Sequence, residues 1–297
     1  HIKKLRREGY KIESKTNQGY SLIRTPELIV PEEILWNLDT DIIGKSIHFF
    51  DELSSTNKKA KELAEKGSPS GSVVMTEKQN KGKGRRGRNW FSPPGTGLWF
   101  SIIVRPDIKP DKAPLLTIMS ALSVKEALER MNINAFVKWP NDILIKNKKI
   151  CGILSELSAE IDSVNYAIIG IGINVNQNQF PEELKNIATS LNIESGRKID
   201  RIKLLKDVFY YFEYFYCKLL SGKDKELLDL WEEKLDIINK PVVVDSNGEI
   251  YKGKAMGISQ KGELILEDKR GEKHSFWTGD TSLLEYYKEG GKNDIDH

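Results

Sequence analysis

The sequence predicts an α+β protein with a mixed β-sheet at its centre. Three observations lead to this prediction. Strand-like apolar stretches alternate with helical apolar patterns between residues 46 and 235. A basic helix-and-hairpin pattern precedes this region, and closely spaced short strands follow it. We therefore expect three parts, covering residues 1–30, 31–236 and 237–297.

Composition excludes several classes of protein. The chain has 297 residues, 39% hydrophobic and 30% charged, with a formal net charge of +3. These values indicate a folded, soluble protein without a global positive field. Two cysteines, Cys151 and Cys217, are too few for a disulfide scaffold. No apolar run near 20 residues and no signal-peptide pattern occurs, so we expect a cytoplasmic protein with no membrane partner.

The first 23 residues have the pattern of the back half of a winged helix-turn-helix. Ile2 and Leu5 are apolar at helical spacing, and strands are expected at Tyr10–Glu13 and Tyr20–Ile23, around a polar turn. In that motif a helix enters the major groove and the hairpin contacts the DNA backbone. We expect the chain to begin inside the motif; an ordinary solvated helix and hairpin is the alternative. Candidate DNA-binding residues are Lys3, Lys4, Arg6, Arg7, Lys11 and Lys15.

The elements of the central part follow from local signals. Arg24–Val30 has the composition of a linker, and Pro31 suits the start of a short helix ending at Leu38. Three consecutive hydroxyl residues from Ser54 are candidate N-caps for the next helix. A helical apolar period covers Leu115–Met131. Strands are expected at SIHFFDEL, VVMTEKQ, GLWFSIIVRP, AFVKW, DILI, KICGILSEL and YAIIGIGINVN, and two further helices within Ile199–Leu235.

Residues 81–90, KGKGRRGRNW, place a dense positive charge between two predicted strands. Glycines allow positive φ angles and bring backbone N–H groups close to an anion. Arginine and lysine add charge-assisted hydrogen bonds. We expect a loop that closes over a polyphosphate; a solvated loop and an RNA-binding arginine–glycine segment are alternatives. The chain contains no Walker A motif.

The strand YAIIGIGINVN has two unlike faces. Glycine inside a strand often marks the close approach of a ligand or of another backbone. A bulge or a close helix contact is the alternative. One face carries Ala167, Ile169, Ile171, Ile173 and Val175, and the other carries Gly170, Gly172, Asn174 and Asn176.

GKGRRGRNW, KWPNDILIKNKKICGIL and GIGINVN, in this order, resemble the motifs of the biotin–protein ligases. With the N-terminal hairpin, the chain resembles the bifunctional type that also represses biotin synthesis genes. The resemblance implies a class II synthetase-like core. The short strands from Pro241, with a hairpin signal at Asn247-Gly248, then look like the SH3-like C-terminal barrel of that family. Lys83 is a departure, because the family commonly has arginine there and lysine lacks the planar fork.

The resemblance also implies the site residues. Catalysis is assigned to Lys149, Arg85 and Asp142. By strand alternation we expect Lys149 to share a face with Cys151. Ser55 and Thr56 match a biotin-contacting pair, with helix capping as the alternative role. Biotin binding is implied for Ser55, Thr56, Gln79, Gly82, Lys83, Arg85, Lys149 and Gly152. Contacts with ATP or the adenylate are implied for Lys83, Arg85, Arg86, Arg88, Trp90, Asp142 and Asn174.

The implied reaction joins biotin and ATP, with Mg²⁺ bridged by the phosphates, into biotinyl-5′-AMP. A lysine of a biotin carboxyl carrier protein then takes the biotinyl group. The adenylate would also act as corepressor, promoting a homodimer that binds operator DNA in the full-length protein. A lipoate–protein ligase or acyltransferase of the same fold, and a DNA-binding repressor without ligase activity, are the alternatives.

Overall fold

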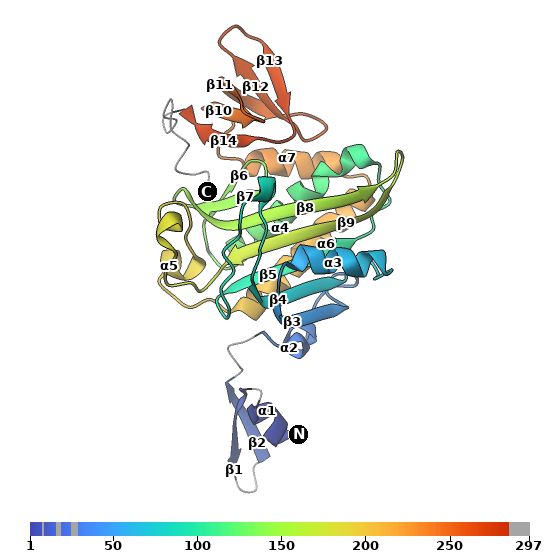
Figure 1. The fold of residues 1–297 in the computed structure, drawn as a ribbon, viewed down its shortest axis with the longest axis vertical. Helices are drawn as coiled ribbons and strands as arrows, with labels where there is room; N and C mark the ends of the chain where they lie inside the picture. Colours follow the sequence, from blue (N-terminus) through green and yellow to red (C-terminus); the bar gives the residue numbers. More distant parts are fainter. Residues whose placement is uncertain (8, 16–18, 25–28, 285–297) are drawn as a thin grey trace.

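The computed structural model describes residues 1–7, 9–15, 19–24 and 29–284, apart from the side chains of Lys4 and Arg24. Figure 1 shows a small helix-and-hairpin unit at one end, a large sheet with helices on both faces in the middle, and a second, smaller sheet at the other end. The greater part of the predicted linker and of the first hairpin turn lies outside the described residues.

The N-terminal unit contains the predicted helix and hairpin. Helix α1 covers Ile2–Arg7, and strands β1 (Lys11–Lys15) and β2 (Gly19–Arg24) pair in antiparallel fashion. The Arg6 guanidinium donates to the carbonyl of Ile12 at 2.8 Å, so it ties the helix to the hairpin. The elements are confirmed; their membership of a winged helix-turn-helix stays a prediction.

The central sheet has seven strands in the order β3-β4-β5-β9-β8-β7-β6. Strands β3 and β4 are parallel, and every other neighbouring pair is antiparallel. The predicted mixed sheet is therefore confirmed. The strands are β3 (Ile47–Leu53), β4 (Val73–Gln79), β5 (Gly97–Val104), β6 (Phe136–Lys138), β7 (Asp142–Ile145), β8 (Lys148–Ala159) and β9 (Val164–Asn174).

Helices cover the two faces of this sheet unequally (Figure 1). The main core lies between the sheet and the long helices α4 and α6, whereas α3 packs on the opposite face through Ala60 and Ala64. The first central helix, α2, ends at Leu35 rather than at the expected Leu38. No helix among the described residues is long and apolar enough to span a bilayer. The helices are α2 (Pro31–Leu35), α3 (Thr56–Glu65), α4 (Pro114–Arg130), α5 (Leu191–Ser195), α6 (Arg201–Leu220) and α7 (Asp224–Lys234).

The two faces of β9 differ as the sequence predicted. The predicted apolar face, Ala167, Ile169, Ile171 and Ile173, is buried in the main core with α4 and α6, whereas Ile168 packs with α3. The opposite face, on the side of α3, carries Gly170 and Gly172. This division leaves one surface of the sheet with little side-chain cover, and the candidate site lies there.

The C-terminal part is a five-stranded antiparallel sheet in the order β13-β12-β11-β10-β14. Asn247 and Gly248 have φ angles of 56° and 91°, which confirms the predicted hairpin turn between the first two strands. Apolar residues of this sheet, Val242 and Leu264 among them, belong to the same core cluster as α4 and α7. The strands are β10 (Pro241–Ser246), β11 (Glu249–Ile258), β12 (Leu264–Asp268), β13 (Lys273–Phe276) and β14 (Asp280–Leu283).

Candidate active site

A cavity of about 120 Å³ lies on the α3 side of the central sheet. Its walls come from the start of α3, the basic loop between β4 and β5, strands β7 to β9, and the beginning of β14. Three predicted site residues, Thr56, Gly82 and Arg86, lie beside the cavity rather than in its wall. The predicted residues that line it are Ser55, Gln79, Lys83, Arg85, Arg88, Trp90, Asp142, Lys149, Gly152 and Asn174.

The glycines of β8 and β9 make room for side chains of the protein itself. A Cβ atom at Gly172 would lie 2.4 Å from Nε1 of Trp90, and one at Gly152 would lie 2.9 Å from the same ring. A Cβ atom at Gly170 would lie 2.1 Å from Oδ1 of Asn57. At Gly170 the neighbour is Asn57 of helix α3, which matches the alternative of a close helix contact, and at Gly152 and Gly172 it is Trp90. The approach of a ligand to these glycines stays a prediction.

Trp90 forms a flat wall of the cavity. Its ring packs edge-on against Trp99, with 6.4 Å between centroids, and the Lys149 ammonium lies 5.3 Å from its centroid. Among the described residues, its buried indole N–H has no hydrogen-bond partner. An aromatic face on a lined cavity can stack a planar heterocycle.

Lys149 and Asp142 form an ion pair inside the cavity, with 2.7 Å between Nζ and Oδ2. The other oxygen, Oδ1 of Asp142, is buried and accepts no hydrogen bond from the part of the chain that the structure describes. Asn174 donates to the backbone carbonyl of Lys149 at 3.4 Å, so its amide supports the strand that carries the lysine. The site therefore combines a held cation with an unused carboxylate oxygen.

The predicted face of Lys149 was wrong. A β-bulge at Ile150 pairs Leu144 with Lys149 but Ile143 with Cys151, which shifts the alternation by one residue. Lys149 consequently lies over Gly152, on the cavity side, whereas Cys151 is buried in the main core. Burial strongly raises the pKa of the Cys151 thiol, which keeps it protonated.

The basic loop has a defined conformation. Residues Arg85–Gly87 form a 3-10 turn in which Arg86 has a φ angle of 54° and Gly87 of 77°. On either side, the N–H of Gly84 donates to the carbonyl of Arg88 at 2.7 Å. The loop thereby forms a small hairpin whose arginines all contact residues 278–280.

The arginines bind a segment of the C-terminal sheet that sequence analysis missed. The Arg85 guanidinium donates to Oδ1 of Asn141 at 2.7 Å, to the hydroxyl of Thr278 and to the carbonyl of Gly279. Burial lowers the pKa of Arg85, with the carboxylates of Asp280 and Asp142 acting in the opposite direction. No local motif marks Thr278 or Gly279, because their partner lies almost two hundred positions earlier in the chain.

Asp280 compensates part of the remaining positive charge of the loop. One carboxylate oxygen, Oδ2, lies 2.9 Å from a guanidinium nitrogen of Arg86 and 2.9 Å from one of Arg88. A single anion therefore holds two arginines at the mouth of the cavity. A phosphate could take the same position, because it offers the guanidinium groups similar oxygen acceptors.

The start of α3 is capped from a neighbouring strand. Ser55 occupies the N-cap position, but its side chain makes no capping hydrogen bond. Instead Oε1 of Gln79 accepts from the N–H of Thr56 at 2.9 Å, and Nε2 of Gln79 donates to Ser92 at 3.0 Å. The capping role considered for Ser55 is therefore wrong, and its hydroxyl remains at the cavity wall.

Comparison with known proteins follows the same division of the chain. Residues 49–174 match the biotin/lipoate A/B protein ligase family, and residues 237–284 match the biotin protein ligase C-terminal domain. The bifunctional ligase/repressor BirA of Bacillus subtilis (strain 168) is 44% identical over 277 residues, covering 92% of this chain and 85% of the relative. The chain belongs to the biotin protein ligase family.

Two further comparisons support the same family assignment. The bifunctional ligase/repressor BirA of Escherichia coli (strain K12) is 31% identical, over 90% of this chain and 82% of its own. The solved structure of the biotin protein ligase from Aquifex aeolicus in complex with biotin and ATP is 32% identical, with a TM-score of 0.70, and covers 80% of this chain and 98% of that one. The predicted resemblance is confirmed.

Within this biotin protein ligase, the predicted DNA-binding residues lie apart from the cavity. Lys3, Arg7, Lys11 and Lys15 are exposed on the helix-and-hairpin unit, at the end of the molecule opposite to the C-terminal sheet (Figure 1). The side chain of Lys4 lies outside the described residues. Arg6 is exposed but is already bonded to the hairpin. The predicted role of these residues stays a prediction.

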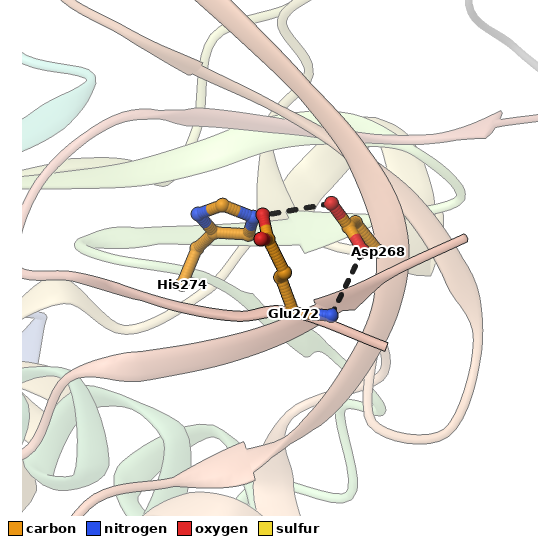
Figure 2. A group of neighbouring side chains, drawn as sticks. All are labelled: Asp268, Glu272 and His274. Carbon is orange, nitrogen blue, oxygen red and sulfur yellow. Dashed lines mark hydrogen bonds and ion pairs between the residues drawn. The ribbon is translucent and has the colours of Figure 1, made fainter. Parts of the chain in front are cut away.

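One group of potential metal ligands occurs in the described part of the ligase, at Asp268, Glu272 and His274 (Figure 2). Oδ1 of Asp268 accepts from the backbone N–H groups of Arg270 at 2.8 Å and of Glu272 at 3.0 Å. Its Oδ2 lies 3.4 Å from Nε2 of His274. These bonds close the turn between β12 and β13, so stabilisation of the turn accounts for the group.

Proposed function

We propose that this protein is an ATP-dependent biotin–protein ligase that also acts as a biotin-responsive transcriptional repressor. The observation that carries the proposal is the cavity in which the Lys149–Asp142 pair faces Trp90 beneath a loop of three arginines. The relatives' printed names, ligase/repressor and biotin–[acetyl-CoA-carboxylase] ligase, support it.

In the first half-reaction, a carboxylate oxygen of biotin attacks the α-phosphorus of ATP. A new O–P bond forms, and pyrophosphate leaves with the electrons of the broken P–O bond. Lys149 and Arg85 would stabilise the negative charge that develops on the phosphoryl oxygens. Trp90 would stack the adenine ring. Mg²⁺, held by the phosphates, would supply further charge neutralisation, and we assign it no protein ligand.

In the second half-reaction, the amine of a lysine on a biotin carboxyl carrier protein attacks the acyl carbon of biotinyl-5′-AMP. A C–N bond forms and AMP leaves. Asp142 is placed to orient the amine or accept its proton, because its buried Oδ1 has no partner among the described residues. The closed basic loop would keep water away from the mixed anhydride.

The direct test is incubation with ATP and labelled biotin, and then with labelled lipoate, followed by addition of a carrier domain. We expect ATP-dependent formation of biotinyl-5′-AMP and transfer to the carrier lysine, with no transfer of lipoate. Lipoate transfer without biotin transfer would contradict the proposal. A lack of either transfer, with operator binding intact, would favour a repressor without ligase activity.

The repressor part of the proposal concerns the N-terminal unit and assembly. We assign residues 1–30 to the back half of a winged helix and its linker, 31–236 to the catalytic part, and 237–297 to an SH3-like domain. Phosphate contacts from six basic side chains alone would give weak, salt-sensitive binding. Two such units in an adenylate-promoted homodimer would bind paired half-sites together.

The repressor part has its own measurement. Operator affinity and sedimentation of the protein are compared with and without biotin plus ATP. We expect dimer formation and much tighter operator binding in the presence of both ligands. Equal operator affinity with and without the ligands would refute the proposed link between ligand binding and DNA binding. It would not affect the ligase proposal.

A further inference from the structure

We infer that Glu156, which lies outside the cavity, is a positioning residue for ligand recognition. It fixes the side-chain amide of Asn57 so that its oxygen is presented to the cavity as a hydrogen-bond acceptor beside the start of α3. This inference rests on the proposed function and adds to it the means by which a ligand with N–H donors is selected.

Asn57 connects the cavity with Glu156. It stands in the first turn of α3, is buried, and lines the cavity, whereas Glu156 lies on β8 and does not. Nδ2 of Asn57 lies 2.6 Å from the Glu156 carboxylate and 3.3 Å from the carbonyl of Leu154. An ionised carboxylate and a carbonyl can only accept, so the amide nitrogen must face both of them.

The orientation of this amide also determines the direction in which the Ser101 hydroxyl donates. Oδ1 of Asn57 lies 2.6 Å from Oγ of Ser101, and because an amide oxygen cannot donate, the proton comes from Ser101. Oγ1 of Thr56 lies 2.8 Å from Oγ of Ser101 and 3.2 Å from Oε1 of Gln79, so the one proton of Thr56 has two acceptors within reach. A chain of contacts therefore connects Thr56, Ser101 and Asn57 and ends on the carboxylate of Glu156.

This chain leaves an acceptor at the cavity. Oδ1 of Asn57 has a second lone pair and lies beside Gly170, where no Cβ atom covers it. Oε1 of Gln79 accepts from the backbone N–H of Thr56 at 2.9 Å and lies 3.2 Å from the Thr56 hydroxyl, so contacts within the protein already occupy it. The amide nitrogen of Asn57 is directed at Glu156 and Leu154, so Asn57 presents an acceptor and not a donor to the cavity.

An acceptor fixed in this way favours a ligand group that carries an N–H donor, such as a cyclic urea. A dithiolane ring offers no donor and would leave this oxygen unpaired, which sites built for hydrogen bonding strongly disfavour. Without Glu156, only the longer contact with Leu154 holds the amide nitrogen, so the Asn57 amide can turn and place its own N–H groups against those of the ligand. The negative charge of Glu156 thus sets the polarity of the recognition site from outside.

The test is a double-mutant cycle with biotin as the probe. Glu156→Ala, Asn57→Ala and the double variant are compared for biotin Kd, for the rate of adenylate formation at saturating biotin, and for unfolding. We expect Glu156→Ala to weaken biotin binding roughly tenfold, as for loss of a hydrogen bond to a charged group. The saturated rate should change less than about twofold, and Glu156→Gln should restore part of the affinity, because its amide oxygen still accepts.

Because Glu156 acts through Asn57, the double variant should bind biotin no more weakly than Asn57→Ala alone. Glu160→Ala, which removes an exposed carboxylate just beyond β8, is the matched control and should bind biotin normally. An unchanged Kd for Glu156→Ala, or additive losses in the double variant, would overturn the inference. Absence of biotin binding by the unmodified protein would instead overturn the proposed function, and this inference with it.

Discussion

Lys149 is held at three points, and its position explains why a single lysine can matter in this site. Its backbone N–H donates to Ile187 and its carbonyl accepts from Thr189, while its ammonium lies between Asp142 and the ring of Trp90. The charge is therefore fixed before any ligand enters. Fixed charges stabilise a developing anion without a reorganisation cost.

Lys149→Ala should reduce the rate of adenylate formation by a factor of about 10²–10³, as for loss of one preorganised donor. Biotin binding should weaken much less, because the lysine acts mainly on the transition state. Pyrophosphate release and biotin Kd measure the two effects separately. Lys148→Ala is the neighbouring control, since its ammonium bonds the carbonyl of Lys185 at the surface. Normal pyrophosphate release by the Lys149 variant would refute the assigned role.

The two cysteines give a second test at the scale of single residues. Cys151 is buried in the core and Cys217 is exposed on α6, although burial raises the pKa of both thiols. A raised pKa lowers the fraction of reactive thiolate at a given pH. In the folded protein at pH 8, a thiol reagent should therefore modify Cys217 alone, and slowly. Both thiols should react in urea, and fast modification of two thiols without urea would contradict the burial of Cys151.

At the scale of elements, the conformation of the basic loop depends on contacts with the start of β14 and with the two residues before it. Asp280 binds Arg86 and Arg88, while Thr278 and Gly279 bind Arg85. In the absence of phosphate, these contacts supply the opposite charge and the acceptors that the arginines need. Loop and strand therefore form one structural unit, although they come from different ends of the chain.

Asp280→Asn should loosen this unit. We expect trypsin to cleave after Arg85, Arg86 or Arg88 several-fold faster in the ligand-free variant, because access to a loop follows its local opening. Biotin plus ATP should restore protection in both proteins, since the adenylate phosphate replaces the lost carboxylate. Glu272→Ala, in the turn between β12 and β13 of the same sheet, is the control. Equal cleavage of the Asp280 variant and the unmodified protein would show that Asp280 does not stabilise the basic loop.

Most elements could be predicted from the sequence because their signals are local. Alternation predicted the two faces of β9, and the Asn247-Gly248 pair predicted the turn after β10. The bulge at Ile150 could not be predicted this way, since it depends on the register with β7. The cavity wall shows the same limit: the motifs predicted Lys149 and Arg85, whereas Asn57 and Asp280 act through contacts between distant segments.

At the scale of the whole molecule, one buried ion pair joins four segments. Glu77 on β4 binds Arg201 of α6 at 2.9 Å, and the two side chains are 6% and 5% exposed. The carboxylate also accepts from the backbone N–H of Ile29 at 2.7 Å and of Gly95 at 3.0 Å. Arg201 in turn donates to the carbonyl of Gly97 at 3.0 Å. The end of the linker, the loop after the basic segment and two core elements therefore share one pair of charges.

Glu77→Ala should lower the free energy of unfolding by about 3–5 kcal/mol, because it leaves a buried arginine without its partner. Urea unfolding followed by fluorescence measures the change. Glu52→Gln is the control, since it removes an exposed ion pair with Lys78 on the same sheet, and the urea midpoint should barely move. Equal midpoints for the two variants would show that the buried pair does not hold these segments together.

The wall of the cavity includes both Ser55 and Asp280, so its parts are made at very different times during translation. A ribosome adding about 5–20 residues per second reaches Asp280 roughly 10–45 s after Ser55. During that interval the nascent chain already carries its cationic loop but not the carboxylate that binds two of the arginines. The loop is thus exposed to cellular polyanions until β14 has been made, and small ligands can stabilise the finished site only after that strand has emerged.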